Sequence, residues 1–176
     1  MIYLGYRRRL MRRKRIEIRQ DIIKTGIFMK IVKLKAEGFW RNRTKLPTYS
    51  GLYFVYAAKV NDKDEIYDER LLYIGEAENI YERHNGTKEK PAKHNHYDDF
   101  VNERKSDEVL KYVTAKYEGS EENRREIQNA LIFRNNPPIN DKSTKSYEGE
   151  DMMIMFTSDN NCSPSNISIK KGEKRD

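Results

Sequence analysis

The sequence predicts an α/β (α+β) fold with a small central three-stranded, mostly antiparallel sheet flanked by helices and preceded by a basic helical arm. Three short segments are rich in aromatic and β-branched residues and are bounded by turn residues, which is typical of strands. Other segments repeat apolar residues at helical spacing. At 176 residues, with 36% apolar and 36% charged residues, the chain fits one domain with extensions.

The predicted strands are 52–60, 70–75 and 108–118. A cluster of Pro47, Ser50 and Gly51 precedes the first strand, and the polar stretch 61–69 joins the first two as a hairpin. Residues 108–118 alternate two sets of side chains along the segment, as a strand does. We therefore expect the first two strands to be antiparallel neighbours, with the third completing the sheet.

Helices are predicted at 77–84, 97–104 and 121–135. The first has apolar residues at Ala77, Ile80 and Tyr81, which fall on one helical face. Ser120 is a favourable N-cap for the last helix, and Asn136 with two prolines ends it.

Three domain ranges follow from this pattern. Residues 1–45 are a basic arm and connector, with a helix over 8–24 and a charged connector over 30–45. Residues 46–142 are the core domain. Residues 143–176 are a partly disordered C-terminal extension with one apolar run, 152–156.

The net charge of +7 comes entirely from the N-terminal arm. Residues 1–28 hold nine Lys and Arg against two Asp and Glu, whereas the rest of the chain holds equal numbers of each sign. Such a block suits contact with phosphates, and it equally suits a solvated tail. Met29 is an alternative start, in which case residues 1–28 lie upstream of the protein, so the function has to be argued from the core domain.

The single cysteine, Cys162, excludes an internal disulfide framework and a cysteine-based zinc site. A reducing, cytoplasmic location is the expectation. No apolar run reaches membrane-spanning length, and no apolar segment with a cleavage site follows the basic N-terminus, so we expect neither a membrane span nor a signal peptide.

An ordered set of short motifs runs through the core domain. Gly51-Leu52-Tyr53 opens the first strand, and Tyr73-Ile74-Gly75 ends the second. Arg83 lies eight residues after Gly75 on the next helix. The last helix carries Leu131-Ile132 and is followed by Asn136-Pro137-Pro138-Ile139-Asn140. In this order the motifs resemble the GIY-YIG nuclease superfamily over about 95 residues. Each tripeptide alone is common, but five elements in order on the expected structures are specific.

The resemblance implies a phosphodiesterase acting on DNA. Tyr53 or Tyr73 would assist the attacking water, although a tyrosine with a pKa near ~10 needs a neighbouring cation or metal to act as a base. Arg83 would stabilise charge on the phosphoryl oxygens through its planar fork. His84, or one of the histidines in the loop that follows, would carry a proton or contact phosphate.

The same resemblance implies one Mg²⁺ (or Mn²⁺) per site and double-stranded DNA as partner. Cutting both strands with a single small site would need a homodimer or two successive nicks. The residues expected to contact DNA are Arg7, Arg8, Arg12, Arg13, Lys93, His94 and Asn140.

The sequence departs from the family at its metal ligand. The family glutamate lies three residues before the Leu-Ile pair at Leu131 and twelve before the final Asn140, and both counts arrive at Gln128. A neutral amide is a poor sole ligand for magnesium. Glu126 is the alternative ligand if the alignment is shifted, although an ideal helix turns it about 200° away from Gln128. Gln128 is then either an engineered change that traps an uncleaved complex or a natural residue.

Three functions remain open at this point. The leading one is a metal-dependent DNA endonuclease of the homing, restriction or repair type, which Gln128 holds inactive. The second is a catalytically silent DNA-binding or regulatory protein on the same fold. The third is an RNA-binding basic arm with a small α/β body, which gives Arg83 no role. Taken singly, the tyrosines, Arg83 and His84 are more often ordinary strand, surface and packing residues.

Overall fold

The computed structural model describes residues 29–40, 42–91, 96–140, 145–158 and 164–175. Residues Ile31–Asp176 form one compact unit, and the residues before it are a separate one. The helix predicted over 8–24 and the arginines expected to contact DNA in the arm lie outside the described residues, as do Lys93 and His94.

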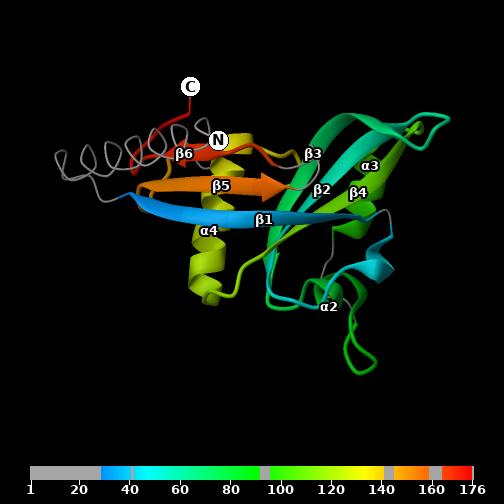
Figure 1. Ribbon diagram of the computed structural model, residues 1–176, viewed down its shortest axis with the longest axis horizontal. Coiled ribbons are helices and arrows are strands. Elements are labelled where there is room, and N and C mark those ends of the chain that lie inside the picture. Colours follow the sequence, from blue (N-terminus) through cyan, green and yellow to red (C-terminus); the bar gives the residue numbers. More distant parts are fainter. Residues whose placement is uncertain (1–28, 41, 92–95, 141–144, 159–163, 176) are drawn as a thin grey trace, which may run out of the picture. The chain divides into compact units, whose positions relative to one another are not determined.

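The described residues fold as a mixed α/β structure around one six-stranded sheet, ordered β3-β2-β4-β1-β5-β6. The strands are β1 (Lys30–Trp40), β2 (Gly51–Val60), β3 (Ile66–Ala77), β4 (Glu108–Lys116), β5 (Met152–Ser158) and β6 (Ile167–Ile169). The pairs β2–β3, β2–β4, β1–β4 and β5–β6 are all antiparallel. The sheet curls, so that β2, β3 and β4 turn away from β1, β5 and β6 (Figure 1).

The three predicted strands are confirmed as β2, β3 and β4, but the prediction of a three-stranded sheet was wrong. The supposed connector 30–45 contains β1, and the supposed partly disordered extension contains β5 and β6. These strands lie outside the range 46–142 and continue the same sheet. Each carries an alternation that buries one side, as Val32 and Leu34 do in β1 and Met152 and Ile154 do in β5.

The helices lie on both faces of the sheet. They are α2 (Ile80–Asn85), α3 (Tyr97–Glu103) and α4 (Glu121–Asn135), with a short 3₁₀ helix, η1 (Arg43–Lys45), before β2. The predicted N-cap is confirmed, because the Ser120 side chain accepts from the Asn123 backbone N–H. Among the described residues, the helices fall short of the length and apolarity that crossing a membrane requires.

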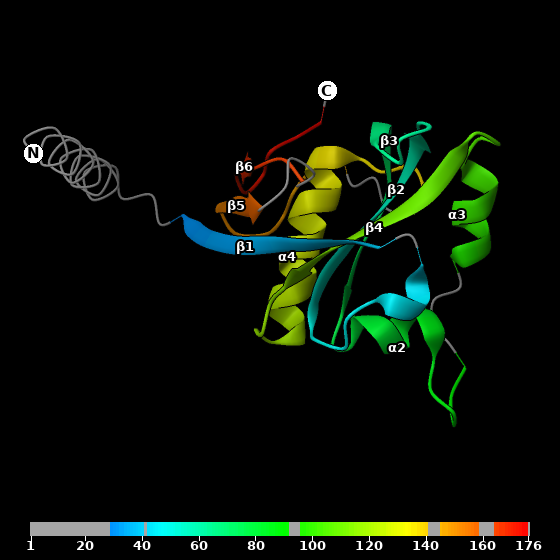
Figure 2. The same cartoon turned by 45° about the vertical axis from the view of Figure 1, so that its right-hand side comes forward.

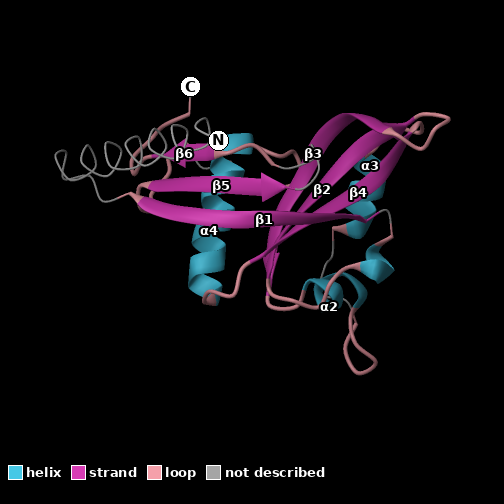
Figure 3. Ribbon diagram, in the orientation of Figure 1, coloured by secondary structure: helices cyan, strands magenta, loops and turns pink. Residues whose placement is uncertain are grey.

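Alternation along the strands gives two cores. Leu52 and Phe54 of β2 face α4, where they join apolar residues of β1, β5 and β6. Tyr53 and Val55 face the other way, toward α2 and α3. Figure 3 shows α4 running across the strands, with α2 and α3 beside β2, β3 and β4. The second core carries the residues that the sequence motifs single out.

The segment after α4 covers the outer edge of β3. As an edge strand, β3 has backbone groups with no strand to pair with, and such groups need partners. The Ile139 N–H donates to the Leu72 carbonyl oxygen at 3.1 Å. Asn140 then bonds both ways with Ile74: its Oδ1 accepts from the Ile74 N–H at 2.9 Å, and its Nδ2 donates to the Ile74 oxygen at 2.9 Å. The predicted stop after α4 therefore also completes the sheet edge.

Candidate active site

Two motif tyrosines and His84 form one aromatic cluster between the sheet and α2. The Tyr53 and Tyr73 rings stack with centroids 6.1 Å apart, and His84 meets Tyr53 edge-on at 4.6 Å. His84 also contacts Tyr112 of β4 edge-on at 5.4 Å. The cluster thus draws residues from β2, β3, β4 and α2 to one place.

The two motif glycines are explained by close approach. Gly75 pairs with Tyr53 across β2 and β3, and a Cβ on Gly75 would lie 2.0 Å from Cζ of the Tyr53 ring. A Cβ on Gly51 would lie 2.1 Å from the backbone oxygen of Ala115 in β4. Only glycine leaves room for the Tyr53 ring at one position and for the neighbouring strand at the other.

Burial decides the protonation of Tyr53. Its side chain is 0% exposed, and this burial raises its pKa well above the ordinary range; Tyr73 adds to the shift and Arg83 opposes it. Tyr53 therefore stays protonated at neutral pH and is sealed from substrate. Tyr73, 7% exposed, also lines a surface cavity, so it is the tyrosine placed to meet a water or a phosphate.

Arg83 stays charged beside these rings. Burial lowers its pKa, but the interactions with Tyr53, Tyr73 and Glu76 are together stronger and raise it. A charged guanidinium that is half-buried beside a tyrosine is well suited to holding an oxyanion, because little water competes for its donors.

His84 is neutral at physiological pH. It is 2% exposed, and burial, followed by the charges of Arg83 and Arg43, lowers its pKa to about 3. Its two edge-on contacts make it a wall between Tyr53 and Tyr112. In this state it packs the cluster and is a very weak base, so the role of proton carrier that the sequence suggested for it finds no support.

Gln128 of α4 contacts β3, the strand that carries Tyr73. Its Nε2 donates to the carbonyl oxygen of Ile74 at 3.0 Å, the oxygen that Asn140 also bonds. Gln128, Asn140, Tyr73 and His96 all line a cavity of about 470 Å³. Arg83 lines a different cavity of about 740 Å³. The proposed site residues therefore surround the end of β3, with Tyr73 between the Arg83 side and the Gln128 side.

Ideal helix geometry predicted that Glu126 points away from the site, and this prediction was wrong. Glu126 lines the same cavity as Gln128, and its Oε1 accepts from the backbone N–H of Glu150 at 3.3 Å. The reason is that the residues after α4 return over this part of the helix, so the cavity wraps around it. Ser146, Tyr147 and Gly149 form that far wall.

The glutamine at position 128 does not fit a magnesium ion. The Gln128 amide is oriented by its bond to Ile74, and what remains is a neutral oxygen, a weak ligand for a hard dication. Within the described parts of the chain, no three His, Cys, Asp or Glu side chains gather as a metal-binding group.

Sequence reasoning missed an ion-pair network next to Arg83. Glu76, directly after the Tyr-Ile-Gly motif, accepts from Nε of the buried Arg124 at 3.0 Å and lies 3.8 Å from Nε of Arg125. All three residues line the cavity of Arg83. The position of Glu76 beside the motif was the only available signal, because its partners are 48 and 49 residues away.

His96 is one of the loop histidines that the sequence offered as a proton carrier or phosphate contact, and it lines the same cavity as Tyr73. Its ring lies 5.4 Å from that of Tyr73, and its Nδ1 lies 2.8 Å from Oδ2 of Asp99. A carboxylate on one ring nitrogen orients the imidazole.

Comparison with known proteins returned no match among protein-family models, curated proteins or solved structures.

Proposed function

We propose that the core of this chain is a GIY-YIG-type DNA endonuclease domain in which Gln128 permits binding of DNA and suppresses its cleavage. The observation that supports this most is the meeting of Tyr53, Tyr73 and Arg83 at the end of β3, next to the Gln128 and Asn140 contacts on Ile74. These residues come from five separate segments: β2, β3, α2, α4 and the stretch after α4. Their order along the sequence is that of the family motifs, and they also lie close together in space, which purely structural roles would not require.

In this proposal Arg83 binds a phosphoryl group and stabilises the charge that develops on it. Tyr73 orients a water, and Tyr53 holds the Arg83 side chain from within the core. Asn140 fixes the end of β3. A Mg²⁺ or Mn²⁺ ion, when a carboxylate is available at position 128, would supply the Lewis acid and the activated water.

One observation favours a second candidate, a silent DNA-binding protein on the same fold. The bond from Gln128 Nε2 to the Ile74 oxygen needs a donor, and a glutamate carboxylate can only accept. Gln128 therefore has a structural partner of its own, which a residue retained only for its shape would not require.

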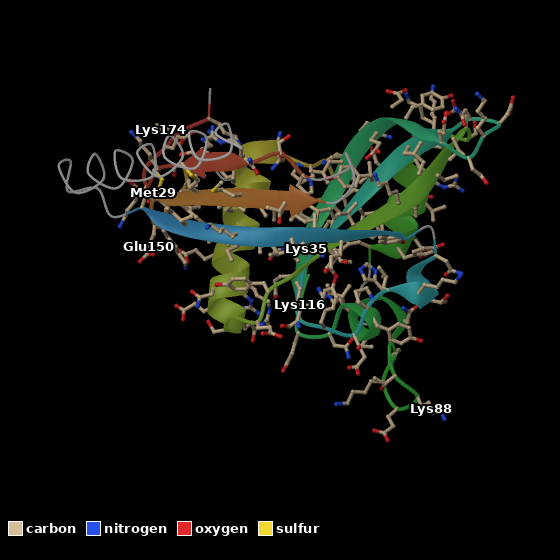
Figure 4. The ribbon with its side chains drawn as sticks, viewed as in Figure 1. Met29, Lys35, Lys88, Lys116, Glu150 and Lys174 are labelled. Carbon is tan, nitrogen blue, oxygen red and sulfur yellow. The ribbon has the colours of Figure 1, made fainter. Side chains whose placement is uncertain are left out.

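Binding of a labelled DNA duplex by the chain as written tests the claim common to both candidates. We expect Arg83→Ala to weaken binding by about tenfold, the scale of one hydrogen bond to a charged group. Lysine should restore little, because it lacks the planar fork. Lys174→Ala is the matched control, since Lys174 is exposed and lines neither the cavity of Arg83 nor that of Gln128. It lies by β6, away from Lys88, which is in the loop after the Arg83 helix α2 (Figure 4). Equal affinity of the wild type and Arg83→Ala would remove Arg83 from the site.

A further inference from the structure

A small cavity behind His84 is built from cationic and aromatic side chains. It measures about 320 Å³ and is lined by Arg43 of η1, Tyr97 and Arg104 around α3, and Tyr112 of β4, among others. Figure 2 shows η1 beside α2, with α3 above it. The cavity does not belong to either of the two that hold the proposed site residues.

The two arginines of this cavity carry charge that no carboxylate neutralises. The Arg43 guanidinium stacks on the Tyr97 ring, 4.1 Å from its centroid, and among the described residues it has no ion-pair partner. Arg104 donates to the backbone oxygen of Glu108 at 2.7 Å. The nearby carboxylates of Glu103 and Glu108 are both held by Arg70. An anion would therefore find two guanidinium groups with donors to spare.

Tyr112 adds a buried polar atom to the wall. Its side chain is 1% exposed, and its hydroxyl makes no hydrogen bond with any described residue. Burial raises its pKa, Tyr97 raises it further, and Arg43 opposes them. All three residues line the cavity. Buried polar groups normally have partners, and an orphaned one beside an unpaired arginine indicates that a ligand or an ordered water supplies the bond.

Position connects this cavity with the proposed site. Tyr112 touches His84, which in turn touches Tyr53, and the charges of Arg43 and Arg83 both lower the pKa of His84. The two arginines thus flank one buried aromatic wall. A strand of DNA presents phosphates at regular intervals, so a chain held at Arg83 can place another phosphate beyond the wall.

We propose that Arg43 and Arg104 form a second phosphate-binding subsite, which holds a further phosphate of the DNA strand bound at Arg83. This inference rests on the proposed function, since it needs the chain to bind DNA. Stacking on Tyr97 holds the Arg43 guanidinium in place beside the cavity, which limits the side-chain freedom that is lost when a ligand binds. The Tyr112 hydroxyl donates to the phosphate, or to a water that bridges to it.

Fluorescence anisotropy with a labelled duplex, measured over a range of NaCl concentrations, tests the subsite. We expect Arg43→Ala to weaken binding about tenfold and to reduce the slope of log K against log salt by about one, as loss of one phosphate contact does. Arg104→Ala should act in the same direction and gives an independent test of the cavity. Tyr112→Phe removes only the hydroxyl and should weaken binding less, with an unchanged slope. Lys174→Ala, the same charge change at a distant site, should stay within about twofold of the wild type.

The outcomes separate the two proposals. If Arg83→Ala weakens binding while Arg43→Ala and Arg104→Ala both behave like Lys174→Ala, the subsite is wrong and the proposed function stands. If the wild type fails to bind DNA even at low salt, both are wrong. Circular dichroism and thermal melting establish that each variant is folded, and an Arg43→Lys variant, which keeps the charge without the fork, should bind with intermediate affinity.

Discussion

The Gln128 side chain and the Ile74 backbone are joined by a 3.0 Å hydrogen bond in which the amide nitrogen of Gln128 donates to the carbonyl oxygen of Ile74. Asn140 bonds the same carbonyl and also the Ile74 N–H. Ile74 is the central residue of the Tyr-Ile-Gly motif and is wholly buried. One residue of the edge strand is therefore fixed by both α4 and the segment that follows it, and this junction brings the cavity of Tyr73 into place.

The first prediction concerns Asn140. Asn140→Ala removes both bonds to Ile74 and leaves its buried N–H without a partner, so we expect the free energy of unfolding to fall by about 1–3 kcal/mol. Urea denaturation measures the change. Asn102→Ala, in the exposed part of α3, removes the same side chain and should change stability by less than about 0.5 kcal/mol. Equal effects of the two substitutions would show that the Asn140 bonds contribute nothing.

The second prediction concerns Gly75 and Tyr53. Gly75→Ala places a Cβ about where the Tyr53 ring now lies, so we expect a loss of stability of about 1–3 kcal/mol or more. Tyr53→Leu replaces the ring with a smaller side chain and opens that space. The cost of Gly75→Ala should therefore be clearly smaller in the Tyr53→Leu background, a coupling that a double-mutant cycle in urea measures. A cost that is the same in both backgrounds would exclude the Tyr53 ring as the reason for the glycine.

The third prediction concerns the pH dependence of stability through His84. Its folded pKa of about 3 lies below the unfolded value near ~6.5, so protonation favours the unfolded chain. Stability from a neutral His84 is present above about pH 6.5 and is lost as the pH falls toward 3. Between pH 7.5 and 4.5 we expect His84→Phe to lose about 2–3 kcal/mol less stability than the wild type. Parallel stability curves for the two proteins over this range would contradict the burial of a neutral His84.

The sequence was sufficient to predict the parts of the fold that depend on local chemistry. The strands 70–75 and 108–118 and the helix 121–135 have turn residues, alternation and a cap within a few positions of themselves. The strand Lys30–Trp40 was missed because its outward-facing lysines resemble a charged connector, although the inward Val32 and Leu34 alternate with them. Its partner β4 lies some 75 residues away, and no local signal carries that pairing.

The site divides in the same way. The motifs predicted Tyr53, Tyr73 and Arg83 together, because spacing along two strands and a helix carries that information. The contact between Gln128 and Ile74 depends on how α4 crosses the edge of β3, which spacing does not determine. Glu126 was misplaced for a related reason: helical geometry gives a direction from the axis but not where the returning chain closes a cavity.

The fourth prediction assigns Arg83 to the chemical step. In a Gln128→Glu background, Arg83→Ala should lower the rate of cleavage by roughly 10²–10³, the scale of losing one donor to a developing charge. Alanine also favours the helix, so α2 should remain folded. Single-turnover cleavage of a labelled duplex measures the rate. A variant that cuts as fast as its Gln128→Glu parent would exclude Arg83 from stabilising the transition state.

The fifth prediction concerns the change Gln128→Glu itself. A carboxylate cannot donate to the Ile74 oxygen, so the new side chain should turn toward the cavity, at a cost of about 0.5–1.5 kcal/mol for the lost bond. There it would offer the charged oxygen that a divalent ion requires. Gln128→Ala is the control, because it removes the same hydrogen bond and adds no charge.

The role of Gln128 is tested most directly by nicking of supercoiled plasmid DNA in Mg²⁺ or Mn²⁺. The proteins to compare are the wild type, Gln128→Glu and Gln128→Ala. We expect all three proteins to bind DNA and only Gln128→Glu to cleave it, at least on the order of 10² times faster than the wild type. Cleavage by the wild type as fast as by Gln128→Glu would contradict the role of Gln128. A Gln128→Glu protein that folds and binds DNA, yet stays inert with both ions, would contradict the endonuclease proposal and favour the silent binding protein.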